Sequence, residues 1–282
     1  MKSNFSPGLL PTDVNKSNCS PPISSLPAKV LMLHGHAQSG QFFQCKTRFF
    51  EERLRNTILE ASRVENASSF IDTVQFHYPS GLFPANPDQP QDDDDGCSAW
   101  AWGYGDHQRD EVQGLQKSVD FLFEILSEEG PFIGVVGFST GAALAAIITS
   151  LLEKRESICG FRFQTDHLPF KFAVCCSGFK LGNPMYEKLY HPAIRTPTLH
   201  AIARMDTMIE PEESLQLAHI CSNVTLYSFF GTHYVPRTAR FLDVLADLMQ
   251  KAFHAGQKSE MKRPEAPFHR LRHTFELETH IG

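Results

Sequence analysis

Apolar residues along the chain fall into two patterns, short runs rich in apolar residues and longer stretches with helical spacing. Short apolar runs bounded by glycine, proline or polar residues are typical of buried strands, whereas apolar positions three and four residues apart are typical of amphipathic helices. Strands are therefore predicted over residues 29–33, 71–77, 133–138, 170–176, 198–203 and 224–229, and helices over residues 41–59, 109–129, 142–152, 212–220 and 238–253.

Strands and helices alternate in this prediction, which indicates an α/β fold with a mostly parallel central sheet and helices on both faces. One domain is expected over residues 28–255, because no repeat or change of composition divides that span. Residues 1–27 are rich in serine, proline and asparagine, and we expect them to form a flexible N-terminal tail. Residues 256–282 show no clear pattern, and we expect a weakly ordered C-terminal tail there.

The segment of residues 81–105 interrupts the alternation and is predicted to be a lid-like insertion. It contains three prolines, the acidic run Asp92–Asp95 and both tryptophans of the chain, Trp100 and Trp102. Long irregular segments inside a domain often carry function. The two tryptophans either bind an apolar substrate or hold the loop against the core, and the sequence leaves both interpretations open.

Charge and cysteine content narrow the class of protein further. A net charge of −6, without any basic run, excludes a typical nucleic-acid-binding protein. The seven cysteines are scattered and match neither a zinc motif nor a disulfide framework, which favours free thiols and a cytoplasmic location. The uncharged stretch of residues 132–152 is long enough to cross a bilayer, but its glycines and hydroxyl residues favour a strand, a turn and a helix.

The strongest chemical motif is the sequence Gly137–Gly141, which reads G-F-S-T-G and lies between a predicted strand and a predicted helix. In that context G-x-S-x-G is typical of a nucleophile elbow, a tight turn that presents a serine at the head of the helix. Ser139 is therefore the candidate nucleophile.

A serine nucleophile needs a histidine base and an acid that orients it, and in α/β-hydrolases these follow the serine in the order acid, then histidine. His233 is the candidate base, because it lies between the last predicted strand and the last predicted helix. Asp206 is the candidate acid, because it follows the strand of residues 198–203, and Glu210 is the alternative.

Two backbone N–H groups should stabilise the oxyanion that forms during acyl transfer. One is predicted at Thr140, directly after the nucleophile, and the other at His36 or Ala37, after the first strand. His34 and His36 could instead form a metal-binding pair, but no carboxylate follows them closely, so no metal is expected. The proposed chemistry also needs no organic cofactor.

Together these motifs resemble those of the fungal FSH-type serine hydrolases, a branch of the α/β-hydrolase superfamily. The resemblance spans about residues 29–253 and rests on Leu33–Gly35 with Gln38–Gly40, on Gly137–Ala142, on the Asp206 segment and on Gly231–Pro236. It implies the same nucleophile, acid and base as the spacing does. The chain departs from the family at Thr140, where glutamine is usual.

The resemblance implies a carboxyl esterase or thioesterase that acts on a small-molecule or carrier-bound acyl substrate. In fungi it also implies release of a polyketide acyl chain, with a polyketide synthase as partner. A sizeable apolar acyl group is expected if Trp100 and Trp102 line the site. Three alternatives remain open: an acyltransferase with the same triad, a non-catalytic binding module, and a nucleotide-binding oxidoreductase, although the glycine spacing does not match G-x-G-x-x-G.

Overall fold

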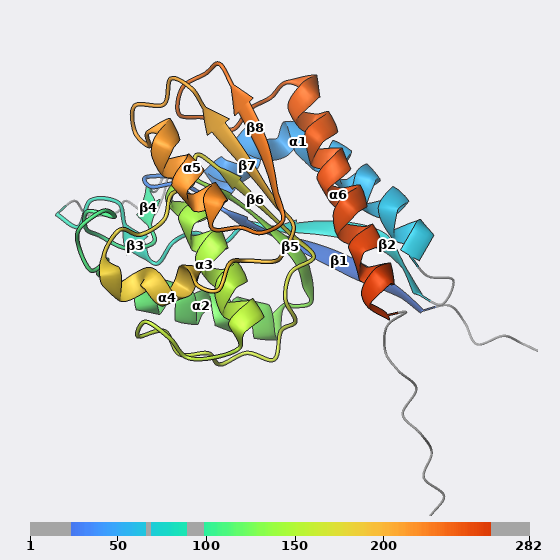
Figure 1. The fold of residues 1–282 in the computed structure, drawn as a ribbon, viewed down its shortest axis with the longest axis horizontal. Coiled ribbons are helices and arrows are strands. Elements are labelled where there is room, and N and C mark those ends of the chain that lie inside the picture. Colours follow the sequence, from blue (N-terminus) through green and yellow to red (C-terminus); the bar gives the residue numbers. More distant parts are fainter. Residues whose placement is uncertain (1–23, 66–68, 89–98, 261–282) are drawn as a thin grey trace, which may run out of the picture.

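The computed structural model describes residues 24–65, 69–88 and 99–260. A six-stranded sheet with the strand order β2-β1-β5-β6-β7-β8 forms its centre, and every neighbouring pair is parallel (Figure 1). The predicted mostly parallel sheet is therefore confirmed. The strands are β1 (Ser24–Leu33), β2 (Ser69–His77), β5 (Phe132–Phe138), β6 (Phe172–Cys176), β7 (Thr198–Ala203) and β8 (Val224–Phe229).

Helices cover both faces of the sheet, as the sequence predicts (Figure 1). Helices α1 (Gly40–Glu65) and α6 (Ala239–Glu260) pack against each other on one face. The other face carries α2 (Leu115–Glu128), α3 (Thr140–Lys154) and α5 (Pro211–His219). A short 3-10 helix (Pro184–Tyr186) and helix α4 (Glu187–Tyr190) lie between β6 and β7. Each face has its own apolar core, so the central strands are buried on both sides.

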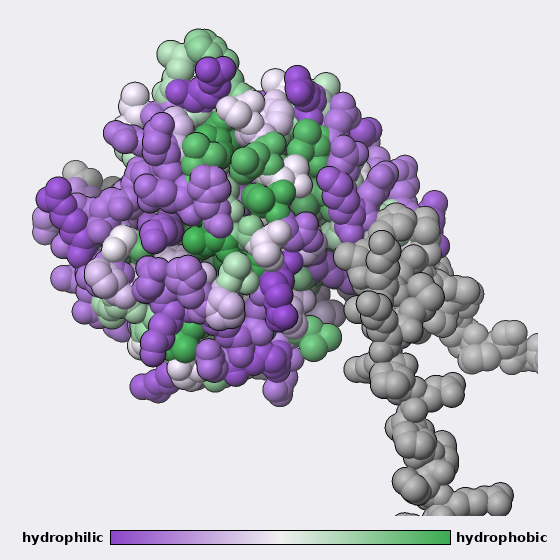
Figure 2. Space-filling model, viewed as in Figure 1, coloured by the Kyte–Doolittle hydropathy of each residue, from purple (hydrophilic) through white to green (hydrophobic). Residues whose placement is uncertain are grey.

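Strand β8 is an exception to the pattern of strands buried on both faces. It lies at the edge of the sheet, where Tyr227 and Phe229 are buried but Val224 and Leu226 are 39% and 48% exposed. Figure 2 shows apolar residues at the surface between α5 and α6. The apolar sequence of β8 suggested full burial, but α5 leaves part of this edge strand uncovered.

Several boundaries differ from the sequence-based expectation. Strand β1 begins at Ser24, which pairs with Ser69 of β2, so residues 24–27 belong to the sheet rather than to the expected tail. Helix α6 continues to Glu260, beyond the expected limit of the domain at residue 255. Helix α2 starts at Leu115 rather than at residue 109, because Gly114 before it has a φ of 81° that interrupts helical geometry.

The predicted insertion contains a small antiparallel pair, β3 (Phe83–Pro84) and β4 (Trp100–Ala101). The acidic run Asp92–Asp95 lies outside the described residues. The uncharged stretch of residues 132–152 forms β5, a turn and part of α3, as predicted. Among the described helices, none combines the length and the apolar character that crossing a membrane requires.

The fold gives a testable pH dependence of stability. Burial lowers the pKa of His200, which lies in β7, from 6.5 to about 4. Between these two pH values the unfolded chain binds a proton that the folded chain does not bind. The free energy of unfolding therefore falls as the pH falls through this window. We expect His200 to account for about 3 kcal/mol of that loss.

Urea unfolding of the native protein and His200→Gln at pH 6.5 and pH 4 would measure this contribution. The variant should lose less stability on acidification than the native protein. His219→Gln is the matched control, because His219 is exposed at the end of α5, and it should keep the native pH dependence. An unchanged pH dependence in His200→Gln would contradict the prediction.

Candidate active site

Ser139 lies in the sharp turn between β5 and α3, as the G-x-S-x-G motif predicts. Its backbone has φ 54° and ψ −122°, a conformation that residues other than glycine rarely adopt. The N–H of Ser139 donates to the carbonyl of Cys176 at the end of β6, over a distance of 2.9 Å. This strained turn holds the serine at the amino end of α3, where the helix dipole favours developing negative charge.

The two glycines of the motif are required by the close approach of backbone segments. A Cβ atom on Gly137 would lie 2.3 Å from the carbonyl oxygen of Gly141, and one on Gly141 would lie 2.2 Å from the carbonyl oxygen of Leu33. Both distances are far below van der Waals contact. Helix α3 can therefore approach β1 and β5 this closely only with glycine at both positions.

An acid and a base meet beside this turn. Asp206 follows β7 and His233 follows β8, and His233 Nδ1 lies 2.7 Å from Asp206 Oδ2. The imidazole ring also packs on Phe138, the residue before the nucleophile, with 4.7 Å between ring centroids. The structure therefore brings the predicted acid and base together, and it places the base against the residue that precedes the predicted nucleophile.

The surroundings of Asp206 keep its carboxylate ionised. Burial on its own would raise the pKa, but hydrogen bonds from the Ile209 N–H, from His233 and from the Met208 N–H outweigh it, and the pKa lies below its usual value. Both N–H groups donate to Oδ1 over 3.0 Å, which leaves Oδ2 for the histidine. No sequence pattern indicated these backbone donors. The alternative acid, Glu210, instead forms a capping box at the start of α5.

The predicted oxyanion donors lie close to the same turn. Thr140 is the first residue of α3, and N–H groups in the first turn of a helix have no acceptor within the helix. The Ala37 N–H donates to the carbonyl of Trp100 over 3.0 Å. The His36 N–H has no acceptor among the described residues. Of the two residues that the sequence left open, His36 is therefore the one with a free donor.

Both tryptophans of the insertion hold the loop that follows β1. The indole N–H of Trp102 donates to the carbonyl of His34 over 2.9 Å, and the Trp100 N–H donates to the carbonyl of Gln38 over 2.9 Å. Trp102 is buried and also lines the cavity next to Thr140. Trp100 is not among the residues that line this cavity. The side chain of Trp102 therefore both anchors the loop and lines the cavity, whereas Trp100 contacts the loop through its backbone.

His34 uses both of its ring nitrogens within the protein. Its Nε2 accepts from the Gly81 N–H over 2.9 Å, so its Nδ1 carries the proton and donates to the Gly35 carbonyl over 2.7 Å. Burial lowers the pKa of His34 to about 4, in agreement with a neutral ring. If His34 bound a metal together with His36, one of these two hydrogen bonds of the His34 ring would have to break.

Two cavities flank the turn. The oxyanion-side cavity, about 90 Å³, is lined by His36 and Thr140 together with Trp102 and apolar residues that include Leu144 and Phe179. The His233-side cavity, about 270 Å³, is lined by the following residues: Gln38, Phe42, Phe43, Lys46, Phe138, His233, Tyr234, Val235 and Arg237. Each cavity contains one sequence neighbour of Ser139, Phe138 in the His233-side cavity and Thr140 in the oxyanion-side cavity.

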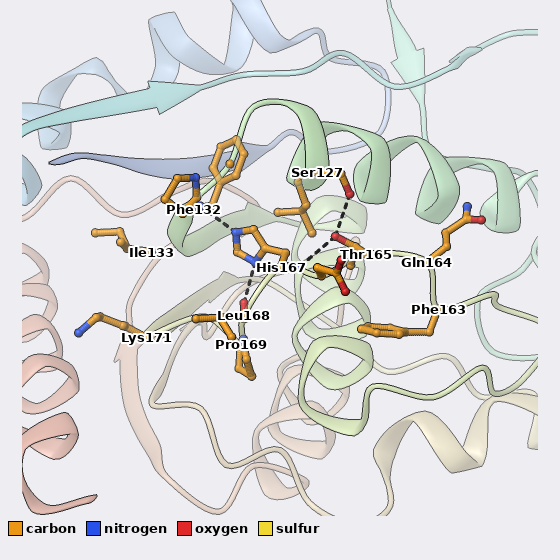
Figure 3. A pocket seen from close by; sticks show the side chains of 14 residues that line it. Ser127, Phe132, Ile133, Phe163, Gln164, Thr165, His167, Leu168, Pro169 and Lys171 are labelled. Carbon is orange, nitrogen blue, oxygen red and sulfur yellow. Dashed lines mark hydrogen bonds between the residues drawn. The ribbon is translucent and has the colours of Figure 1, made fainter. Parts of the chain in front are cut away.

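A larger cavity of about 760 Å³ lies away from this site, beside Phe132 at the start of β5 (Figure 3). Ser139 follows the other end of that strand, roughly 20 Å away for seven residues. Around this cavity, His167 accepts from the Phe132 N–H over 2.8 Å, and the hydroxyls of Ser127 and Thr165 lie 2.9 Å apart. Several of its polar groups therefore bond to one another, and size alone does not mark it as the catalytic site.

The fold and the elbow define the class of the protein, a serine hydrolase with the α/β-hydrolase fold. Its fold is similar to that of an acyl-protein thioesterase 2 from Zea mays, with a TM-score of 0.53, 17% identity and coverage of 82% of this chain and 95% of that one. The chain belongs to the family described as "Serine hydrolase (FSH1)", whose model matches residues 24–245. The resemblance inferred from the motifs is therefore confirmed.

Curated relatives agree with this assignment. The chain is 30% identical to "Family of serine hydrolases 2" from Saccharomyces cerevisiae, over 79% of this chain and 97% of the relative. It is 29% identical to "Esterase OVCA2" from Xenopus tropicalis, over 79% of this chain and 92% of the relative. It spans about half the length of two matching relatives from Schizosaccharomyces pombe, with 50% and 51% of their lengths covered.

Proposed function

We propose that this chain hydrolyses a carboxylic ester or thioester through an acyl-enzyme formed on Ser139. The observation that carries the proposal is the 2.7 Å contact of His233 with Asp206, beside a serine held at φ 54° at the head of α3. Serine hydrolysis needs a nucleophile, a base and a group that orients the base, and these three residues supply the three roles.

The mechanism assigns one task to each group. Ser139 Oγ attacks the carbonyl carbon while His233 Nε2 takes its proton, and the N–H groups of His36 and Thr140 donate to the oxyanion. His233 then returns the proton to the departing alcohol or thiol. Water attacks the acyl-enzyme by the same sequence of proton transfers. Asp206 holds the Nδ1–H of His233 throughout and stabilises the imidazolium.

The oxyanion-side cavity supports a short acyl group. A carbonyl oxygen that binds His36 and Thr140 places the acyl chain in this cavity, whose walls are largely apolar. Its volume of about 90 Å³ is about a third of the 270 Å³ of the His233-side cavity. We therefore propose a short acyl group, rather than the sizeable one expected from the two tryptophans.

The proposal also covers the acyl acceptor, the carrier and partner of the substrate, and the location of the protein. Transfer of the acyl group to an alcohol or amine would use the same three residues, so the acyltransferase alternative differs only in the acceptor. A carrier-bound thioester, and a polyketide synthase as partner, fit this cavity only with a short acyl terminus. We also propose a cytoplasmic location, which the free thiols of Cys45, Cys159, Cys175, Cys176 and Cys221 support.

Hydrolysis of p-nitrophenyl esters with acyl chains of increasing length tests the function and the size of the cavity. We expect kcat/KM to be greatest for acetyl or butyryl esters and to fall about tenfold or more for octanoyl, because each methylene group that a pocket rejects costs roughly tenfold or more. The variant Phe179→Leu should shift this preference toward longer chains, because Phe179 lines the cavity.

Phe172→Leu is the matched control. Phe172 is equally buried but packs in the core on the α1 and α6 face of the sheet, so its replacement should leave the chain-length preference unchanged. Failure of the folded native protein to hydrolyse any ester of the series would refute the proposed function. If kcat/KM were greatest for the octanoyl ester, only the proposed size of the acyl group would be refuted.

A further inference from the structure

Among the described residues, the walls of the His233-side cavity carry only positive formal charges. Two cationic side chains, Lys46 of α1 and Arg237 before α6, line its walls, and no Asp or Glu is among its lining residues. The remaining lining residues are uncharged apart from the titratable His233. This local excess of positive charge contrasts with the net charge of −6 of the whole chain.

Neither cation is neutralised by a carboxylate of the described chain. Lys46 Nζ lies over the ring of Phe42, 4.9 Å from its centroid, and the Arg237 guanidinium carbon lies 5.3 Å from the ring centroid of Phe49. Within the described ranges no ion pair involves either residue. Cation–π contacts orient a positive charge without cancelling it, so both cations remain available to an anion.

The position of this cavity relates it to one part of the substrate. His233 returns a proton to the departing oxygen or sulfur, so the leaving group must lie against the imidazole. His233 lines this cavity, whereas the oxyanion donors line the other one. The leaving group therefore enters the cavity that contains Lys46 and Arg237, and the acyl group enters the cavity next to Thr140.

We propose that the natural substrate is an ester or thioester whose alcohol or thiol part carries a negatively charged group, a phosphate or a carboxylate, bound by Lys46 and Arg237. This inference rests on the proposed function, because it names the substrate class of the same site. The reaction stays a hydrolysis: the bond from the acyl carbon to oxygen or sulfur breaks, water supplies the hydroxyl of the acid, and the leaving group takes the proton from His233.

Three S-acetyl thioesters test the proposal: those of 3-mercaptopropanol, 3-mercaptopropionate and 2-mercaptoethyl phosphate. The acyl group is the same in all three, and the thiol parts are short chains that end in a neutral hydroxyl, a carboxylate or a phosphate. An exposed ion pair contributes roughly twofold to fivefold. We therefore expect the native protein to favour at least one anionic thioester over the neutral one by about fivefold to tenfold in kcat/KM. The preferred anion identifies carboxylate or phosphate as the group recognised.

The variants Lys46→Gln and Arg237→Gln should each reduce the preference for the anionic thioester about threefold. In the double variant, kcat/KM should be nearly the same for the anionic and the neutral thioester. Each variant is judged by its own ratio of kcat/KM for the anionic thioester to kcat/KM for the neutral one, so a general loss of activity does not count as a loss of the preference. Arg48→Gln and Arg240→Gln are matched controls, because both cations are exposed nearby on α1 and α6 but do not line the cavity. They should keep the native ratio. An ionic strength of about 1 M should also reduce the preference, since the Debye length is then about 3 Å.

Two results would overturn the inference: equal kcat/KM for all three thioesters in the native protein, or an anion preference that survives in the double variant. Failure of the proposed function gives a different result. In that case Ser139→Ala would hydrolyse the neutral thioester as fast as the native protein does. Loss of neutral-thioester hydrolysis in Ser139→Ala, together with no anion preference in the native protein, refutes the charged leaving group only.

Discussion

Replacing Ser139 by alanine should lower kcat by a factor on the order of a million and abolish labelling by a fluorophosphonate probe. The probe reacts with a serine only when a base removes its proton and the oxyanion site accepts the phosphoryl oxygen. We expect Ser139 to react in this way. It directly precedes the free N–H of Thr140, and it directly follows Phe138, whose ring packs on His233. Residual hydrolysis would come from the oxyanion donors and substrate binding alone.

Ser150→Ala is the matched control for this experiment. Ser150 is also buried and lies on the same helix, α3, but its hydroxyl donates to the carbonyl of Leu189 and not toward the active site. It should label as the native protein does. Equal labelling of Ser139→Ala would mean that another residue is the nucleophile. Absence of labelling in the folded native protein would favour a non-catalytic binding module.

Replacing Asp206 by asparagine should lower kcat by about 10⁴-fold while the protein stays folded. The Asp206 carboxylate accepts the Nδ1–H of His233 and thereby leaves Nε2 unprotonated to act as a base. An asparagine can keep the bonds from the N–H groups of Met208 and Ile209 through its carbonyl oxygen, but its amide then donates to Nδ1. The imidazole takes the wrong tautomer, and it loses the negative charge that stabilises its protonated form.

Measurements of kcat and of the urea midpoint for Asp206→Asn separate this effect from unfolding. Glu210→Gln should change the urea midpoint slightly and kcat by less than threefold, because Glu210 caps α5 and takes no part in the contact with His233. The reverse outcome, a large loss in Glu210→Gln and a small one in Asp206→Asn, would show that Glu210 is the acid.

Local sequence determined the elements and the elbow. A strand buried on both faces, such as β5, must be apolar throughout, and a tight strand-to-helix turn such as Gly137–Gly141 needs glycine where backbones nearly touch. Such requirements act on neighbouring residues, so they can be seen in one sequence. They were enough to predict the class of fold, the nucleophile, and the strand ends at which Asp206 and His233 lie.

Other features depend on contacts between distant segments, and only the tertiary structure decided them. The insertion with Trp100 and Trp102 holds the loop after β1 and leaves His36, not Ala37, with a free N–H. Lys46 and Arg237 lie far apart in the sequence but line the same cavity. The apolar run of β8 looked like that of a central strand, but its place at the edge of the sheet left one side partly exposed.

The sequence by itself therefore determined the candidate residues of the site, and the tertiary structure decided the space around them. Reactive groups are restricted to a few residue types at defined places relative to strands and helices, and one chain shows these directly. The volume of a cavity and the charge of its walls depend on side chains that meet only after folding. Phe179 after β6 lines the cavity that also contains Thr140, and Lys46 on α1 lines the cavity that also contains His233, because the fold brings these distant segments together.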